Sequence, residues 1–437
     1  MNMEFHRHAE SPRQATRLEE IEGRFDRSIA CMVVLLAAFG LVMVGSSSIA
    51  VAEGLGVGPH HFLLRHAVFL GLGALLAALI MRVELRELER HSHLLVLLGL
   101  VLLLAVFIPG LGRTVNGARR WLNLGITGFQ AVEAVKLFLI IWMASYLARY
   151  RDQVQSEWTA AFKPFLVVGA MVMLLLFQPD FGSAVLLLAI TLCLIWLGGV
   201  RLLHVLVPVS VVTPIMVLVA LSESYRMRRL TSFMDPWKDP FNDGFQLTQA
   251  LIAIGRGEWA GVGLGGSVQK LFYLPEAHTD FIFSVIAEEL GFIGIVALLT
   301  VIGLLVWRAF KLGLRAVEMG RGFAGFCALG VGVWLALQSV VSIGVNLGLL
   351  PTKGLTLPLV SSGGSSVLMS CAAFALLLRV SYELDRSERQ VARHKESRQP
   401  VQLTPIEEPL VLGPAPQPLR LGSRGRLRIE PSLGEIA

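Results

Sequence analysis

The chain has 437 residues, of which 54% are hydrophobic and only 16% are charged, and its mean hydropathy is +0.65. A soluble domain of this length is not expected to be so apolar, which excludes most classes of soluble enzyme and indicates a polytopic membrane protein. The formal net charge of +6 reflects the flanks of the apolar segments and the tail, so we expect no nucleic acid partner.

Apolar segments recur along the chain at lengths that suit membrane helices. A hydrocarbon core about 30 Å thick needs roughly 20 apolar residues per helix. Ten segments fit, near residues 29–51, 62–81, 94–110, 130–148, 164–179, 182–199, 202–221, 281–307, 323–348 and 356–380. Because the backbone in lipid must form its hydrogen bonds internally, the sequence predicts an all-α polytopic membrane protein with ten transmembrane helices.

The flanking charges predict the orientation of these helices. The N-terminal segment, residues 1–28, is rich in arginine and has no evident cleavage site, so we expect it to be cytoplasmic and the first helix to be retained. Ten crossings then place the C-terminus in the cytoplasm too, after a membrane domain at residues 29–380. The charged and Pro-rich tail, residues 381–437, is expected to be disordered. The four cysteines fall in apolar segments without metal-ligand spacing, and we expect no disulfide.

One connection is much longer than the others. Residues 222–280, between the seventh and eighth apolar segments, form a large extracytoplasmic loop that we expect to be functional. Its apolar stretch at residues 245–257 is too short to span a bilayer and predicts an interfacial or re-entrant helix, followed by a glycine-rich turn. That glycine-rich stretch lacks the strand and lysine of a nucleotide-binding loop. A second outer segment, residues 116–130, mixes arginine with aromatic residues and suggests an interfacial element.

The outer connections contain more basic residues than the positive-inside rule leads one to expect. This excess indicates an anionic ligand, although for any single residue contact with lipid headgroups is the simpler interpretation. Arg119 with Arg120, and Lys353 beside a membrane boundary, are the better candidates for binding a phosphate. The outer basic residues are Arg113, Arg119, Arg120, Arg226, Arg228, Arg229, Lys238, Arg256, Lys270 and Lys353.

Ionisable residues also occur within or between apolar segments. Glu133 and Lys136 lie in the fourth segment at a spacing of three, which places both on one helical face. They form either a structural ion pair or part of a functional site. Asp180 lies between the fifth and sixth segments, where helix capping and ligand contact explain it equally well.

The stretch LPEAHTDFIF, residues 274–283, gathers Glu276, His278 and Asp280 immediately before an apolar segment. Asp280 could act simply as a helix cap, favoured by the helix dipole. One carboxylate would suffice for that purpose, and the other polar groups need a further explanation. A carboxyl group at an apolar boundary, with a tunable pKa, can act as a general base toward a sugar hydroxyl.

Several long motifs resemble one family closely and in order. They are NGARRW followed by Gln130, Glu133 and Lys136, then QPDFGS, GGSVQKLFYLPEAHTDFIFSVIAEELG and GLLPTKGLTLPLVSSGGSS. Together they resemble the SEDS family of shape, elongation, division and sporulation proteins over most of residues 30–380. The form PTKGLTLP is more similar to the division branch of the family than to the elongation branch.

The resemblance implies a peptidoglycan glycosyltransferase that polymerises lipid II into β-1,4 glycan strands at the division septum of the bacterial inner membrane. Its partners would be a class B penicillin-binding protein and other divisome membrane proteins. The essential aspartate of the family falls on Asp280, the catalytic candidate. A divalent cation, Mg²⁺ or Mn²⁺, is suggested by the family and by the pyrophosphate leaving group, and no nucleotide is expected. The substrate-binding candidates are Arg119, Arg120, Glu133, Lys136, Lys270, Glu276, His278, Lys353 and Ser365.

Two other functions remain open at this stage. Intramembrane charges are also typical of transporters, so a lipid II flippase using Glu133, Lys136 and the outer basic residues is the principal alternative. A noncatalytic scaffold that recruits the transpeptidase is a third hypothesis. The concentration of polar residues on the outer side favours an enzyme.

Overall fold

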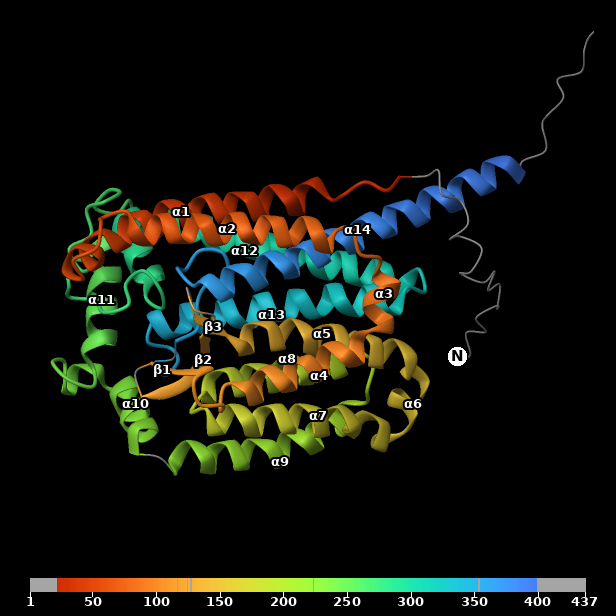
Figure 1. Ribbon diagram of the computed structural model, residues 1–437, viewed down its shortest axis with the longest axis horizontal. Coiled ribbons are helices and arrows are strands. Elements are labelled where there is room, and N and C mark those ends of the chain that lie inside the picture. Colours follow the sequence, from red (N-terminus) through yellow and green to blue (C-terminus); the bar gives the residue numbers. More distant parts are fainter. Residues whose placement is uncertain are drawn as a thin grey trace, which may run out of the picture. The chain divides into compact units, whose positions relative to one another are not determined.

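The computed structural model describes residues 22–115, 117–123, 125, 128–222, 224–352 and 354–398, and most of them are helical (Figure 1). The helices are α1 (Arg27–Gly54), α2 (His61–Ile80), α3 (Leu85–Arg90), α4 (Ser92–Ala105), α5 (Ala131–Arg149), α6 (Arg151–Ser156), α7 (Trp158–Phe177), α8 (Phe181–Leu197), α9 (Leu202–Leu221), α10 (Ser224–Met234), α11 (Phe245–Gly257), α12 (Ile282–Glu318), α13 (Gly322–Asn346) and α14 (Gly364–Arg398), with a 3₁₀ turn, η2, at Pro236–Lys238. The strands are β1 (Gly112–Val115), β2 (Ala118–Asn123) and β3 (Gly128–Gln130).

The helices coincide with the apolar segments predicted from the sequence. Among the described residues, six helices are long and apolar enough to cross a membrane: α1, α2, α5, α12, α13 and α14. Shorter apolar helices, α4, α7, α8 and α9, cover the other predicted segments. The chain is therefore a polytopic membrane protein.

The prediction of an exclusively helical fold is wrong for residues 112–130. β1, β2 and β3 form a small antiparallel sheet in that order. The register pairs Val115 with Ala118, so the two residues between them, Asn-Gly in the sequence, connect the strands. Asn-Gly is the preferred sequence for a two-residue hairpin connection, and this local preference explains the sheet.

The centre of the bundle is formed by α5 and α13, whose side chains are mostly buried, whereas those of α1 and α2 are mostly exposed. α13 packs against α12, α5 and α8, and α5 also packs against α4. The exposed apolar residues of α1 and α2 are what a lipid-facing surface requires. Polar groups on α5 and α13 are thereby enclosed by protein.

Two aspartates cap helices in the way that the sequence allows. The carboxylate of Asp26 accepts hydrogen bonds from the backbone N–H groups of Ser28 and Ile29 at the start of α1. Asp180 likewise accepts from the backbone N–H and the hydroxyl of Ser183 at the start of α8. Of the two interpretations of Asp180, capping is therefore the one that these contacts support.

The last helix differs from its predicted bounds at both ends. It starts at Gly364 and not near residue 356, because Pro358 and the positive φ of Leu359 (63°) interrupt helical geometry before it. It then continues through residues 381–398, where the sequence predicts disorder. Pairs such as Arg389 with Asp385, 2.7 Å apart and four residues apart in sequence, support the helix beyond its apolar part.

The long loop at residues 222–280 contains α10, η2 and α11, and α11 confirms the helix predicted at residues 245–257. α11 packs against α12. Figure 1 shows α10, α11 and the sheet gathered at one end of the bundle.

Helix α12 is broken near its start, and the loop repairs the break. Gly291 has φ 65° and ψ −164°, a conformation that is essentially restricted to glycine. The carbonyls of Glu288 and Glu289 accept from the N–H groups of Val262 (2.9 Å) and Gly263 (3.0 Å). On the other side of the break, the Phe292 and Ile293 N–H groups donate to the carbonyls of residues 258 and 259. The broken helix thus leaves none of these four backbone groups unpaired, as an apolar environment demands.

This break predicts a large loss of stability for Gly291→Ala. A Cβ at that position would lie 2.3 Å from the backbone nitrogen of Gly261, and the backbone conformation disfavours any side chain. We expect a loss of at least about 2 kcal/mol in unfolding free energy. The measurement is denaturant unfolding of the purified protein in detergent micelles. Gly303→Ala is the matched control, because a Cβ on Gly303 in the same helix meets nothing within 4 Å. Equal stability of the two variants would contradict the prediction.

Candidate functional site

Asp280 lies immediately before α12 and is held there by α13. The side-chain amide of Asn346, the last residue of α13, donates a hydrogen bond of 2.9 Å to the backbone carbonyl of Asp280. The carboxyl group lies against the segment between α13 and α14, because a Cβ on Gly354 would be only 2.7 Å from Asp280 Oδ2. Two segments that are distant in sequence therefore meet at Asp280, with Asn346 at its backbone carbonyl and Gly354 at its carboxyl group.

The surroundings of Asp280 raise its pKa from the ordinary 3.8 to about 7. Burial is the main cause, because it disfavours the charged form, and the nearby carboxylate of Glu276 raises the pKa further. The positive charges of Arg229 and Arg120 act in the opposite direction. A carboxyl group with a pKa near neutrality, accompanied by cations, can take up and release a proton beside an anionic substrate.

The two arginines come from different elements. Arg120, on β2, donates from Nη2 to the carbonyl of Pro179 (3.1 Å), and its Nε has no hydrogen-bond partner within the described part of the chain. Arg229, on α10, donates from Nη1 to the carbonyl of Thr352 at 3.5 Å. The sheet and the loop helix thus each supply a cation to the environment of Asp280.

Glu276 and His278 lie beside Asp280, as their spacing suggests. Glu276 is exposed and accepts a hydrogen bond of 2.6 Å from the hydroxyl of Thr279. His278 is buried against the ring of Phe62, and burial is the main cause that lowers its pKa. The neutral form of His278 is therefore favoured, and its proximity adds no positive charge to the site.

Lys136 and Glu133 form a fully buried ion pair deeper in the bundle. Lys136 Nζ lies 2.9 Å from Glu133 Oε1 and donates a second bond of 2.7 Å to Gln338 Oε1 on α13. The Gln338 amide donates in turn to the carbonyl of Thr356 (2.8 Å), and the Thr356 hydroxyl bonds the Ser366 hydroxyl. This network joins α5, α13 and the start of α14, which is the frame that carries Gly354.

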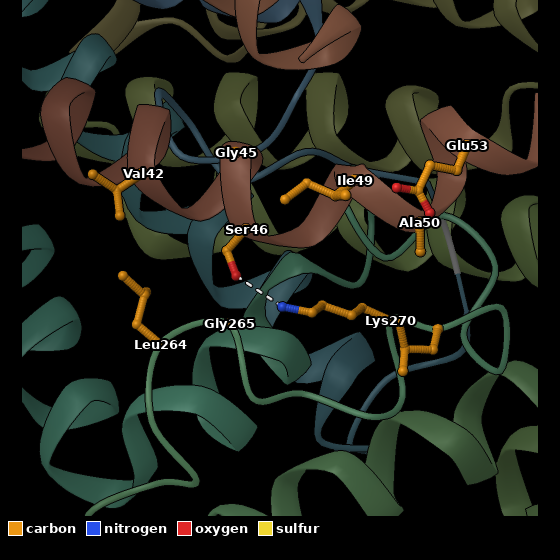
Figure 2. A pocket seen from close by; sticks show the side chains of 10 residues that line it. Val42, Gly45, Ser46, Ile49, Ala50, Glu53, Leu264, Gly265 and Lys270 are labelled. Carbon is orange, nitrogen blue, oxygen red and sulfur yellow. Dashed lines mark hydrogen bonds between the residues drawn. The ribbon is translucent and has the colours of Figure 1, made fainter. Parts of the chain in front are cut away.

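Lys270 belongs to a separate cluster of side chains and does not contact Asp280. Its Nζ lies 2.6 Å from Glu289 Oε1 and 3.0 Å from the Ser46 hydroxyl. Lys270 and Ser46 border a cavity of about 430 Å³ between the C-terminal half of α1 and residues 264–271, shown in Figure 2. Its other lining residues are mainly apolar, among them Val42, Ile49 and Leu271. The structure thus pairs Lys270 with a carboxylate and gives it no contact with Asp280.

Glu288 is a second buried carboxylate that is paired with a cation from the long loop. Glu288, next to Glu289 on α12, is fully buried and accepts from Arg256 Nη1 (3.0 Å), the backbone N–H of Val268 (3.0 Å) and the hydroxyl of Ser267. These bonds fasten the loop to the first turns of α12. Two adjacent carboxylates inside an apolar segment are a signal that sequence reasoning could have used.

The remaining candidates have separate environments. Arg119 donates to the backbone carbonyls of Ile108 (2.8 Å) and Gly112 (3.3 Å), which are contacts that stabilise the base of the hairpin. Ser365 is buried in the first turn of α14. Lys353 lies outside the described residues.

Divalent cations such as Mg²⁺ are held by several oxygen ligands, mainly carboxylates, phosphates and water. Within residues 22–398, leaving out the undescribed positions, no group of three or more His, Cys, Asp or Glu side chains is placed to hold a metal ion. Glu276 and Asp280 provide two carboxylates at most. Mg²⁺ at phosphate sites is usually held by one or two carboxylates together with substrate phosphates and water, so a site made by protein groups alone is not required for it.

The structure also adds residues that the sequence did not single out for the site. Asn346 and Gly354 contact Asp280 directly, and Gln338 binds Lys136. Arg229 was one of many outer basic residues, with no pattern to distinguish it. The apolar helices define a polytopic membrane protein, and Asp280, whose pKa responds to Arg120 and Arg229, is its candidate acid–base group.

Comparisons with known proteins identify the family. A family model described as cell cycle protein, which covers the FtsW, RodA and SpoVE proteins, matches residues 26–386. The chain belongs to this family. It is 58% identical over 395 residues to the probable peptidoglycan glycosyltransferase FtsW of Xanthomonas oryzae pv. oryzae, covering 90% of this chain and 80% of that protein. It is 49% identical to the protein of the same name from Thioalkalivibrio sulfidiphilus, covering 82% and 90%.

Solved structures agree with this assignment. A chain from a peptidoglycan synthase complex that coordinates polymerization and crosslinking matches with a TM-score of 0.68 and 33% identity, covering 82% of this chain and 98% of that one. The rod shape determining protein RodA of Thermus thermophilus matches with a TM-score of 0.59 and 32% identity, covering 84% and 98%. The resemblance to SEDS proteins drawn from the motifs is confirmed.

Proposed function

We propose that the chain is a peptidoglycan glycosyltransferase that polymerises lipid II into β-1,4 glycan strands for septal wall synthesis. The observation that carries the proposal is the half-buried carboxyl group of Asp280, with its pKa near 7, beside Arg120 and Arg229. Similarity to proteins named peptidoglycan glycosyltransferase supports the reaction class. The proposal includes ten crossings of the bacterial inner membrane at the septum, both termini in the cytoplasm and residues 222–280 outside.

The reaction needs a base toward an alcohol. In the proposed step, Asp280 takes the proton from the 4-hydroxyl of the acceptor GlcNAc of lipid II, and the oxygen attacks the anomeric carbon of the growing strand. Because the donor is α-linked and the product is β-linked, one inversion is expected, by analogy with the base in inverting glycosidases. General-base catalysis of this kind contributes about 10² to 10⁴ in rate.

The leaving group is undecaprenyl pyrophosphate, and its departure develops negative charge. In the proposed step Arg120 and Arg229 stabilise that charge, and their electrostatic effect on Asp280 supports this role. The proposal keeps the other substrate-binding candidates. Among them are Lys353 and Lys136, although Lys136 forms a buried ion pair. The activated donor supplies the driving force, so no nucleotide is needed. Involvement of Mg²⁺ or Mn²⁺ stays a proposal too, tested by polymerisation in EDTA with either ion restored.

The proposed partner is a class B penicillin-binding protein, together with other divisome membrane proteins. The structural match to a chain of a synthase complex that couples polymerization to crosslinking supports a transpeptidase partner. A synthase of this kind would hand nascent strands to the crosslinking enzyme. The proposal concerns proteins and lipid II, and includes no nucleic acid.

The test is a polymerisation assay with labelled lipid II on the purified chain in complex with its transpeptidase, in which crosslinking is blocked. Glycan strands longer than a disaccharide dimer are the expected product. A parallel assay in proteoliposomes measures lipid II flipping. Flipping without glycan formation would establish the transporter alternative, and neither activity in an intact complex would establish the scaffold.

The pH dependence of this reaction tests the base directly. Because Asp280 must be ionised to accept a proton and its pKa is about 7, we expect the rate at pH 6 to be about a tenth of the alkaline plateau. Glu276→Gln removes a like charge and should move the acid limb, the rise of the rate on the acidic side of the pH profile, to lower pH. Arg229→Gln removes an opposite charge and should move the limb to higher pH. Limbs that stay fixed or move in the same direction would contradict the assignment.

A further inference from the structure

The backbone at Asp280 is diverted from the helix that follows it. Within a regular helix the carbonyl of residue 280 would accept from the N–H of Ser284, four residues later. Here that carbonyl accepts from Asn346 Nδ2 (2.9 Å), and the Ser284 N–H is shared between Asn346 Oδ1 (3.1 Å) and the carbonyl of Phe281 (3.1 Å). The side-chain amide of Asn346 therefore takes the place of a helical hydrogen bond and keeps Asp280 outside the first turn of α12.

The hydrogen-bonding groups of the Asn346 side chain are all satisfied by protein partners. Its side chain is completely buried, and its amide also accepts from the Ser284 hydroxyl (2.8 Å) and donates to the carbonyl of Ser342 on α13 (2.8 Å). All four hydrogen-bonding positions of the amide are thus used. A residue that binds only protein groups in this way, with no face toward a substrate, has a geometric role.

The carboxyl group itself is limited by Gly354. A Cβ at that position would lie 2.7 Å from Asp280 Oδ2, closer than real Cβ contacts allow. The φ of Gly354 lies outside the left-handed region, so its backbone would accept alanine. Because the obstructing atom is the end of a rotatable side chain, Gly354→Ala would turn the carboxyl group aside and would not break the fold.

We propose that Asn346 and Gly354 are positioning residues that fix the direction of the Asp280 carboxyl group. Asn346 sets where the chain enters α12, and Gly354 leaves the space into which the carboxyl group points. The inference rests on the proposed function, because its consequence is for proton transfer by Asp280. A misplacement of about 1 Å in such a group can reduce a rate on the order of 10²-fold.

The test measures kcat, KM and the pH profile of lipid II polymerisation by the complex with its transpeptidase. Gly354→Ala should lower kcat on the order of 10²-fold, with KM within about twofold of wild type. Asn346→Leu should lower kcat similarly and move the acid limb to lower pH, because a loosened chain admits water to the carboxyl group.

Matched variants separate positioning from general damage. Gly303→Ala adds the same methyl group in open space in α12, and Leu187→Ala opens a cavity in α8 away from the contacts of Asp280. Both controls should keep the wild-type acid limb and KM. The inference is overturned if Gly354→Ala retains kcat within twofold, or if Asn346→Leu loses activity only in proportion to its folded fraction. Inactive wild type, or active Asp280→Asn, would instead overturn the proposed function.

Discussion

Asp280→Asn should abolish nearly all lipid II polymerisation while leaving the complex with the transpeptidase intact. Asparagine keeps the size of the side chain and the backbone contact with Asn346, but it cannot accept the acceptor's proton. We expect kcat to fall by about 10² to 10⁴, the usual contribution of a general base, with little change in substrate binding. The measurement is the initial rate of glycan formation, compared with wild type at pH 8.

The same variant has a thermal signature that excludes unfolding as the cause. The pKa of Asp280 is raised in the folded protein, from 3.8 to about 7, so folding binds a proton in the pH range between these values. The stability associated with the protonated carboxyl is present below about pH 4 and is lost as the pH rises through 7. At pH 8 Asp280→Asn should therefore melt above wild type, and the difference should shrink toward pH 5. A variant that melts lower at pH 8, or polymerises at the normal rate, would contradict the assignment.

Much of the fold followed from local sequence signals. Apolar length located the apolar helices, although not the short polar ones such as α3, α6 and α10, and the apolar stretch at residues 245–257 predicted α11 with its observed bounds. Asp280 became a candidate through the crowding of polar groups before an apolar segment and through the resemblance to the family, and its catalytic role stays a prediction. The spacing of Glu133 and Lys136 predicted a shared face, and the structure places them 2.9 Å apart. These are interactions within one helix or one short segment, which sequence periodicity reports.

The misses have physical causes of two kinds. The hairpin was not predicted because its strands are short and contain arginines, so that the Asn-Gly pair before Ala118 is the main local signal for it. Asn346, Gly354 and Arg229 were missed because their roles depend on tertiary interactions with a residue far away in the sequence, as in the bond from Asn346 to Asp280, which spans 66 residues. Neither an asparagine near a helix end nor a glycine in a loop carries a pattern that names its distant partner.

Helix α13 connects the candidate site at Asp280 with the buried ion pair of Glu133 and Lys136. Asn346 and Gln338 both lie on α13, and one binds the chain at Asp280 while the other binds Lys136 and the carbonyl of Thr356. Thr356 follows Gly354 by two residues. The segment that borders the Asp280 carboxyl group is thus tied to the intramembrane pair through a single helix, so removal of Lys136 should be felt in both stability and catalysis.

Lys136→Met should therefore destabilise the protein strongly. It leaves Glu133, which is buried, without its cation, and leaves Gln338 Oε1 with one partner fewer. Breaking one side of a buried pair costs about 3 to 5 kcal/mol, whereas replacing both sides by uncharged groups of similar volume costs little. Unfolding in detergent by a denaturant measures the difference, with Glu133→Gln/Lys136→Met as the matched double variant.

The double variant also decides between the two interpretations of this pair. We expect it to regain most of the wild-type stability and to remain at least about 10-fold below wild type in polymerisation, because a buried cation that helps to stabilise developing negative charge has no uncharged substitute. Full activity in the double variant would show that the pair is structural only. A single variant as stable as wild type would contradict the burial of an unpaired carboxylate, since such a charge has neither water nor a counterion to compensate it.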